Sequence, residues 1–171
     1  MTERDIRLTP TSYIVLGLIA AAGRATPYDL KRVHAEGIGG FWSLNHAQLY
    51  AEPDRLTEAG YLTVERERGG RRRKSYELTE RGRAAFDEWL ANPTAEFTEL
   101  RDPGLLQLFF GAAPGPLAEV QRRIHAERLA EYEALREQAG GWPEGARLVL
   151  ESGIGHEREW LSFWERVAHE R

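Results

Sequence analysis

Two runs of eight residues flank a Gly69–Gly70 pair, and this feature constrains the fold more than any other. The runs cover residues 61–68 and 71–78. Apolar residues lie far from the glycines and charged residues lie close to them; the apolar set is Leu62, Val64, Tyr76 and Leu78. A Gly-Gly pair between two such runs is typical of a β-hairpin with a tight two-residue turn. The pattern therefore predicts a hairpin whose base packs on a core and whose charged tip projects into water.

Two short helices are expected near the start of the chain. Thr9 and Thr26 are each followed by proline. A hydroxyl side chain caps the first free N–H groups of a helix, and proline fits the first helical position because its missing N–H is not needed there. We expect helices over about 10–22 and 27–36, each ended by a glycine.

A third helix is expected over His46–Glu58, immediately before the hairpin. Asn45 and Gln48 have the spacing of a capping box, in which each side chain satisfies a backbone N–H of the other residue. Pro53 lies inside this segment. Because proline removes one backbone donor and clashes with the preceding turn, we expect a kink or a break near residues 51–52.

The chain is expected to form two domains, residues 1–92 and 93–171. Thr79 caps a further helix that reaches about Ala91, and Asn-Pro-Thr at 92–94 then ends the first domain. The second domain is read as wholly helical. A short apolar helix precedes two long amphipathic helices, joined by a turn at residues 140–143. These carry more apolar surface than an antiparallel helix pair covers by itself, so a second chain is the simplest cover.

Charge is distributed unevenly along the 171 residues, whose net charge is −4. Residues 1–90 carry 14 basic and 13 acidic side chains, whereas residues 91–171 carry 9 and 14. Residues 65–76 alone hold six basic groups and two acidic ones. Because ligand steering depends on the local field, the average does not argue against nucleic acid. The sequence contains no cysteine, which excludes disulfides and thiol chemistry.

No apolar run approaches the roughly 20 residues that span a bilayer, and the N-terminus lacks the apolar centre of a signal peptide. We expect a cytoplasmic protein without membrane contact. Five histidines form no recognised metal-ligand pattern, and no nucleophile has a neighbouring base. No metal, cofactor or enzymatic activity is therefore expected.

Three helices followed by a two-stranded hairpin are the order of a winged helix-turn-helix. The expected fold is mainly α with a small β-hairpin: an N-terminal winged helix-turn-helix plus a C-terminal helical dimerisation domain. The start of a recognition helix reaches base edges in the major groove. Here the polar side chains in that place are Ser43, Asn45, His46 and Gln48. A basic hairpin tip, Arg71, Arg72, Arg73 and Lys74, is placed to contact the DNA backbone or the minor groove.

Each of these features has a simpler explanation. Asn-x-x-Gln is often only a helix cap, and a basic hairpin tip is often only a solvated one. Winged helices also serve as protein-binding modules without DNA contact. The coincidence of a polar helix start and a basic hairpin in the expected order favours DNA binding.

The sequence resembles the PadR family of transcriptional regulators. The resemblance rests on residues 41–50 (FWSLNHAQLY), 55–56 (RL), 58–62 (EAGYL) and 73–83 (RKSYELTERGR). It implies a homodimer that binds a pseudo-palindromic operator in double-stranded DNA, usually as a repressor, with small aromatic or lipophilic compounds as effectors. It carries DNA contact onto Ser43, Asn45, His46, Gln48 and Tyr50, and onto Arg71, Arg72, Arg73, Lys74 and Tyr76. Pro53 departs from the family pattern.

Trp160 and Trp164 lie one helical turn apart on the expected last helix. The simpler interpretation is a core or a dimer seam. The alternative is an aromatic effector slot between subunits, with Phe109, Phe110 and Trp142 as further walls.

Overall fold

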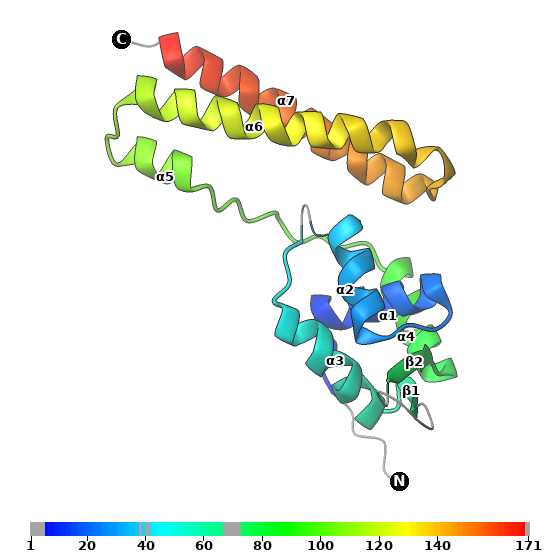
Figure 1. Ribbon diagram of the computed structural model, residues 1–171. Coiled ribbons are helices and arrows are strands. Elements are labelled where there is room, and N and C mark those ends of the chain that lie inside the picture. Colours follow the sequence, from blue (N-terminus) through cyan, green and yellow to red (C-terminus); the bar gives the residue numbers. More distant parts are fainter. Residues whose placement is uncertain (1–5, 38, 40–41, 67–72, 170–171) are drawn as a thin grey trace. The chain divides into compact units, whose positions relative to one another are not determined.

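The computed structural model describes residues 6–37, 39, 42–66 and 73–169. The chain forms two compact units, Met1–Glu96 and Phe97–Arg171. The boundary between them lies in a segment without regular structure, residues 93–102, which follows the last helix of the N-terminal unit (Figure 1). Residues 93–101 are all exposed.

The N-terminal unit has the predicted order of elements. It consists of α1 (Pro10–Ala22), α2 (Pro27–Glu36), α3 (His46–Glu58), β1 (Leu62–Arg66), β2 (Lys74–Leu78) and α4 (Glu80–Ala91). The side chains of Thr9, Thr26, Asn45 and Thr79 each accept a hydrogen bond from a backbone N–H in the first turn of the helix that follows. The polar caps read from the sequence therefore fix the starts of all four helices.

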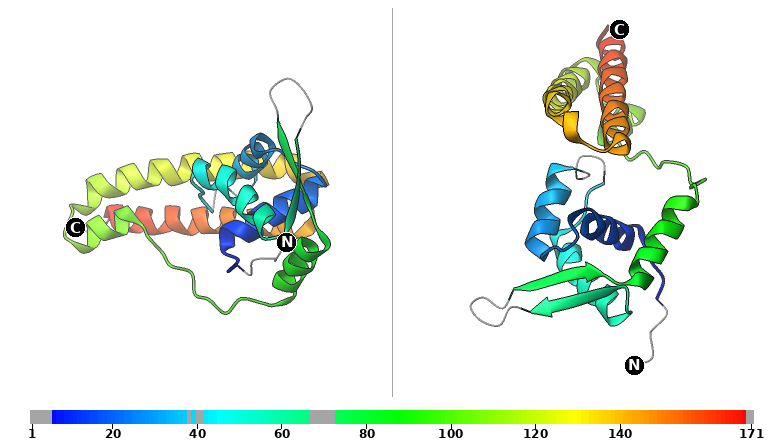
Figure 2. Two further views of the ribbon diagram at one scale, coloured as in Figure 1. Left: turned by 90° about the horizontal axis from the view of Figure 1, so that it is seen from below. Right: turned by 90° about the vertical axis from the view of Figure 1, so that its right-hand side faces the viewer.

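Helix α1 lies at the centre of this unit and packs against α2, α3, α4 and β2 (Figures 1 and 2). Val15, Leu16 and Ile19 are completely buried on it. The other helices contribute Leu30, Leu49 and Leu56 to the same cluster, and the hairpin contributes Leu62 and Tyr76. Burying each of these aliphatic side chains stabilises the fold by about 2 kcal/mol, so the cluster anchors both α3 and the base of the hairpin.

The two strands pair antiparallel, with Leu62 opposite Leu78, Val64 opposite Tyr76 and Arg66 opposite Lys74. A regular two-residue turn at Gly69–Gly70 would instead place Arg66 opposite Arg73. The observed register is thus offset by one residue from the predicted turn, and the turn itself lies outside the described residues. The reason is burial: residues directly opposite each other lie on the same face, so the apolar residues at 62, 64, 76 and 78 share a face only when even-numbered residues pair with even-numbered ones.

Helix α3 continues without a break through Pro53, so the break that the sequence suggested is absent. The proline ring is completely buried, and the Pro53 carbonyl accepts a hydrogen bond of 2.7 Å from the Thr57 hydroxyl. Proline has no N–H, so Pro53 cannot bond to the Leu49 carbonyl one turn earlier. The helix tolerates this loss because Leu49, Pro53 and Leu56 together form its buried side.

The C-terminal unit consists of α5 (Pro103–Phe109), α6 (Pro114–Gln138), a short 3₁₀ turn η2 (Ala139–Gly141) and α7 (Glu144–His169). The long helices α6 and α7 lie side by side and antiparallel, as predicted (Figure 1). His125 and Glu157 join them through a 2.6 Å contact between Nδ1 and Oε2, and Arg158 joins Glu133 at 2.6 Å. Over the described part of the chain, no helix is both long and apolar enough to cross a membrane.

Gly82 in the first turn of α4 provides a test of this packing. A Cβ at this position would overlap the backbone carbonyl oxygen of Tyr61, which cannot move without shifting β1. Gly82→Ala is therefore expected to lower the free energy of unfolding by about 1–3 kcal/mol.

Gly145→Ala in α7 is the matched control, because nothing lies within 4 Å of the added Cβ. Alanine is the better helix former, so this variant should be neutral or slightly stabilising. Urea unfolding followed by circular dichroism measures both. Equal stability of the two variants would show that the Gly82 contact is wrong.

Candidate nucleic-acid interface

Helix α3 has one buried side and one polar, exposed side. Leu49, Pro53 and Leu56 are buried against the core. The predicted contact residues Gln48 and Tyr50 on the helix, and Ser43 and Asn45 just before it, are all exposed, Tyr50 at 49%. The described structure thus brings four of the five predicted recognition-helix residues to the surface at the start of one helix. His46 begins α3, but its side chain lies outside the described part of the protein.

The predicted capping box is present at this helix start. The Asn45 side chain accepts a 3.0 Å hydrogen bond from the Ala47 N–H, and the Asn45 N–H donates a 3.1 Å bond to Gln48 Oε1. The Asn-x-x-Gln pattern is therefore a helix cap, as the simpler interpretation holds. The cap bonds use the side-chain oxygens, so the Nδ2 group of Asn45 and the Nε2 group of Gln48 can still donate to another partner.

A polar network, which sequence reasoning did not identify, fixes α3 against α1. The buried Ser12 hydroxyl donates a 2.7 Å bond to Glu52 Oε1. Arg55 binds both carboxylate oxygens of Glu52 at 2.6 and 2.8 Å and also donates to the Ser12 hydroxyl at 2.9 Å. Ser12 lies 40 and 43 positions before Glu52 and Arg55 in the sequence, so no local pattern indicates its contacts with them.

The wing is the hairpin of β1 and β2 together with its tip, and its predicted contact residues differ in exposure. Arg71 and Arg72 lie outside the described residues, and Arg73 is exposed. Tyr76, by contrast, is only 1% exposed and lies in the core. The structure thus places this predicted contact residue in the core cluster, unlike the exposed Arg73.

Lys74 also has a partner within the protein. Its ammonium group contacts both oxygens of Asp54 at 2.8 and 2.6 Å, and the Tyr76 hydroxyl donates a 2.7 Å bond to Asp54 Oδ1. The bond from Lys74 is the main cause that lowers the pKa of Asp54 below its ordinary value of 3.8. Burial, followed by the bond to Asp54, raises the pKa of Tyr76. Asp54 is therefore ionised and Tyr76 is neutral at physiological pH.

Arg24, in the turn between α1 and α2, connects this turn to the hairpin, a contact that the sequence did not predict. It donates hydrogen bonds to Glu65 on β1 and Glu77 on β2. These bonds, that to Glu77 first, raise the pKa of Arg24. Two like charges on neighbouring strands repel, and a shared arginine removes this repulsion.

The five predicted aromatic residues of the C-terminal unit lie in two separate clusters and one exposed pair. Trp160 and the completely buried Trp164 belong to a cluster with Ala118 and Val167, whereas Trp142 packs on Ala139, Leu150 and Ile154. Phe109 and Phe110 contact each other edge to face and are about four-fifths exposed, at 82% and 78%. The structure therefore does not bring the five predicted residues into one slot within a single chain, and Trp164 has the core role of the simpler interpretation.

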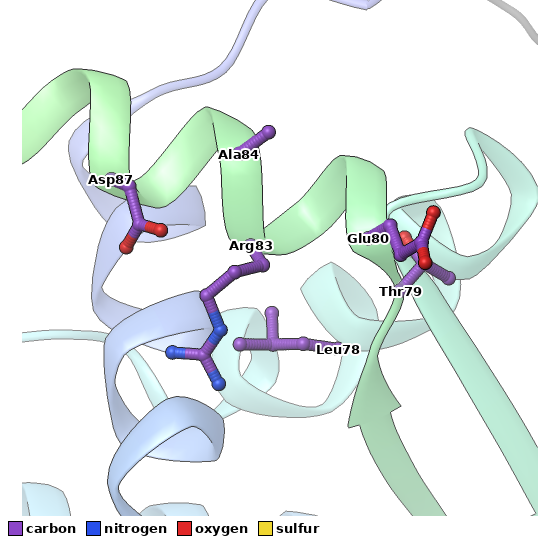
Figure 3. A pocket seen from close by; sticks show the side chains of 6 residues that line it. All are labelled: Leu78, Thr79, Glu80, Arg83, Ala84 and Asp87. Carbon is purple, nitrogen blue, oxygen red and sulfur yellow. The ribbon is translucent and has the colours of Figure 1, made fainter.

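A cavity of about 450 Å³ lies beside the start of α4 (Figure 3). Its lining residues are Leu78, Thr79, Glu80, Arg83, Ala84 and Asp87, none of which is a predicted site residue. Glu80 lies away from Asp87 along α4, with Arg83 between them, so the polar groups do not converge on one point (Figure 3). Within the residues that the structure describes, no group of three or more acidic or histidine side chains is placed to hold a metal ion.

Three helices, the third with an exposed polar start, and an antiparallel hairpin define a winged helix-turn-helix protein. The transcriptional regulator PadR-like family matches residues 15–88, and a second family, the virulence activator alpha C-terminal region, matches residues 100–170. The negative transcriptional regulator PadR of Bacillus subtilis (strain 168) is 31% identical over 91% of this chain and 93% of its own length. The chain belongs to the PadR-like family of transcriptional regulators.

Solved structures share the fold. Bacillus subtilis PadR in complex with operator DNA has a TM-score of 0.83 at 24% identity, covering 95% of this chain and 98% of that one. The PadR-like regulator BC1756 from Bacillus cereus has a TM-score of 0.78 at 20% identity, covering 91% and 94%. Bacillus subtilis PadR in complex with p-coumaric acid has a TM-score of 0.75 at 24% identity, covering 95% and 97%.

Proposed function

We propose that this regulator binds a pseudo-palindromic operator in double-stranded DNA as a homodimer and represses transcription from the nearby promoter. We propose that it does so in the cytoplasm, as expected for a regulator that binds chromosomal DNA in a bacterium such as the source of its relative. The observation that carries the proposal is the division of α3 into a buried side and an exposed polar side beside the hairpin. Burial fixes the helix, and the polar side remains available to read bases.

The side chains at and just before the start of α3 suit major-groove recognition. Amide groups such as those of Asn45 and Gln48 pair with adenine in two-bonded contacts, and the Ser43 hydroxyl suits several bases. All three are exposed. A good two-bonded contact contributes about 1–3 kcal/mol of discrimination against the wrong base.

The hairpin tip supplies the part of the affinity that does not depend on sequence. Arg71, Arg72 and Arg73 follow one another in the sequence beside β2, and arginine binds phosphate through two parallel N–H groups. In our proposal these arginines neutralise DNA phosphates and release the counterions bound there. The relative from Bacillus subtilis has been solved on operator DNA, which supports the same use of the shared fold here.

Replacing all three of these arginines with alanine tests the wing. Affinity should fall for every DNA sequence, and the slope of log K against log salt should become shallower by about 0.9 for each lost phosphate contact. Fluorescence anisotropy with a labelled duplex, titrated at several salt concentrations, measures both. An unchanged slope would remove the wing from the proposed interface.

Two matched variants complete that experiment. Arg101→Ala removes a charge from the exposed connecting segment and should leave the slope as it is. Ser43→Ala removes a proposed base contact without a charge, so it should weaken the preferred duplex only. Failure of the native protein to bind any duplex would refute DNA binding altogether.

The exposed apolar residues of the C-terminal unit support a homodimer. Large apolar side chains that are more than two-fifths exposed there include Leu106, Phe109, Phe110, Val120, Ile124, Leu148 and Val149. Large apolar side chains that are exposed in such number usually mark an association site. A two-fold dimer also matches the two halves of a pseudo-palindromic operator.

Phe109→Glu is expected to convert the dimer into a monomer, because it places a charge in the proposed apolar contact without disturbing a buried residue. Phe97→Glu is the control, since Phe97 is an exposed phenylalanine of the connecting segment. Size-exclusion chromatography with light scattering measures the mass of each. A monomeric native protein, or a Phe109→Glu variant that remains dimeric, would contradict this placement.

We further propose that a small aromatic or lipophilic compound releases the regulator from DNA. Support comes from the relative's complex with p-coumaric acid and from the exposed phenylalanine pair at the end of α5. p-Coumaric acid and a panel of aromatic acids and lipophilic cations, titrated against the DNA complex, should identify at least one compound that lowers bound anisotropy. Quenching of tryptophan fluorescence by the same compound should occur without DNA. A panel without either response would refute this part of the proposal.

A further inference from the structure

Asp54 on α3 binds two side chains of strand β2. Its carboxylate accepts hydrogen bonds from Lys74 Nζ at 2.6 and 2.8 Å and from the Tyr76 hydroxyl at 2.7 Å. Both donors belong to β2, whereas Asp54 lies six residues after Gln48 on the helix that we propose reads bases. The three side chains therefore connect the two DNA-contacting elements directly.

Tyr76 links this contact to the body of the unit. Its backbone N–H donates to the Ala25 carbonyl at 2.9 Å, and its carbonyl accepts from the Ala25 N–H at 3.1 Å. Its ring is buried in the core, and its hydroxyl reaches Asp54. One residue thus fixes β2 to the turn after α1 through its backbone and to α3 through its side chain.

Lys74 contributes no free positive charge in this arrangement. Its side chain is only about one-third exposed, at 34%, and its ammonium contacts both oxygens of one carboxylate. The neighbouring Arg73, in contrast, is exposed. Arg73 can therefore reach DNA in our proposal, whereas Lys74 is engaged by a carboxylate of the protein itself.

We propose that Asp54 is a positioning residue for DNA recognition: it sets the place of the wing strand relative to α3 and withholds Lys74 from phosphates. The inference rests on the proposed DNA-binding function. In this role Asp54 favours sequence-specific binding and weakens sequence-independent binding. Fixed geometry favours the correct base sequence, whereas a free ammonium at position 74 would strengthen binding to every sequence.

Asp54→Asn separates these effects. The amide oxygen still accepts the Tyr76 hydroxyl bond, but the charge that holds Lys74 is lost. Affinity for a shuffled duplex should rise several-fold and its salt slope should steepen by about 0.9, the value of one additional phosphate contact. The ratio of affinities for the preferred and shuffled duplexes should fall. A residue that only stabilised the fold would lower both affinities and leave the salt slope alone.

Two further variants isolate the two donors. Tyr76→Phe removes the hydroxyl bond and keeps the Asp54–Lys74 pair, so the affinity ratio should fall while the salt slope stays native. Asp54→Asn combined with Lys74→Gln removes both charges, so the slope of the double variant should return to the native value because no ammonium is freed. Asp87→Asn on α4 makes the same charge change away from these contacts and should preserve the affinity ratio.

The assay uses the full-length protein, the tightest-binding duplex selected from a random library, and a shuffled duplex of the same composition. Fluorescence anisotropy across a salt series gives the affinities and slopes, and thermal unfolding confirms that each variant is folded. A native slope in Asp54→Asn, or a steeper slope that persists in the double variant, overturns the inference. If Asp54→Asn does not fold, Tyr76→Phe decides by its affinity ratio: a native ratio overturns the inference. If the native protein binds no duplex, it is the proposed function that fails.

Discussion

The packing of α3 against α1 is the constraint on which the N-terminal unit depends. Leu49, Pro53 and Leu56 fill the space over the buried side of α1, and this contact determines which side of α3 remains exposed. The Ser12–Glu52–Arg55 network lies on the same seam and adds directional bonds to non-directional packing. Rotation of α3 would bury its polar side chains without partners, which costs about 1–3 kcal/mol for each unsatisfied group. The orientation of the polar face is thus a consequence of the core.

Local signals in the sequence were sufficient for the elements and their order. Threonine and asparagine caps predicted all four helix starts of this unit, and the spacing of apolar residues predicted the antiparallel pair α6 and α7. The hairpin shows where one local signal outweighed another. Gly69–Gly70 indicated a two-residue turn, but the apolar residues at 62, 64, 76 and 78 are all even-numbered. Strand pairing that places them on one face requires an odd-length connection, so burial and not the glycine pair determines the register.

The contacts that sequence reasoning missed are polar and distant in the chain. Arg24 meets Glu65 and Glu77 across separations of 41 and 53 residues, and Asp54 meets Tyr76 across 22. Propensity and periodicity act over a few residues, so they contain no information on such pairs. The same limit explains Tyr76: a tyrosine within a basic family motif suggests a surface contact, but its even position on β2 places the ring in the core.

These polar contacts also affect how charge is distributed around the hairpin of an acidic chain. Three acidic residues on or near the hairpin have cationic partners: Glu65 and Glu77 share Arg24, and Asp54 holds Lys74. Paired carboxylates contribute little repulsion at a distance, because the field of an ion pair falls more steeply than that of a single charge and salt screens what remains within about 10 Å. The excess of negative charge belongs to residues 91–171, with 14 acidic and 9 basic side chains. The net charge of −4 therefore does not describe the local field at the hairpin, where these carboxylates already have cationic partners.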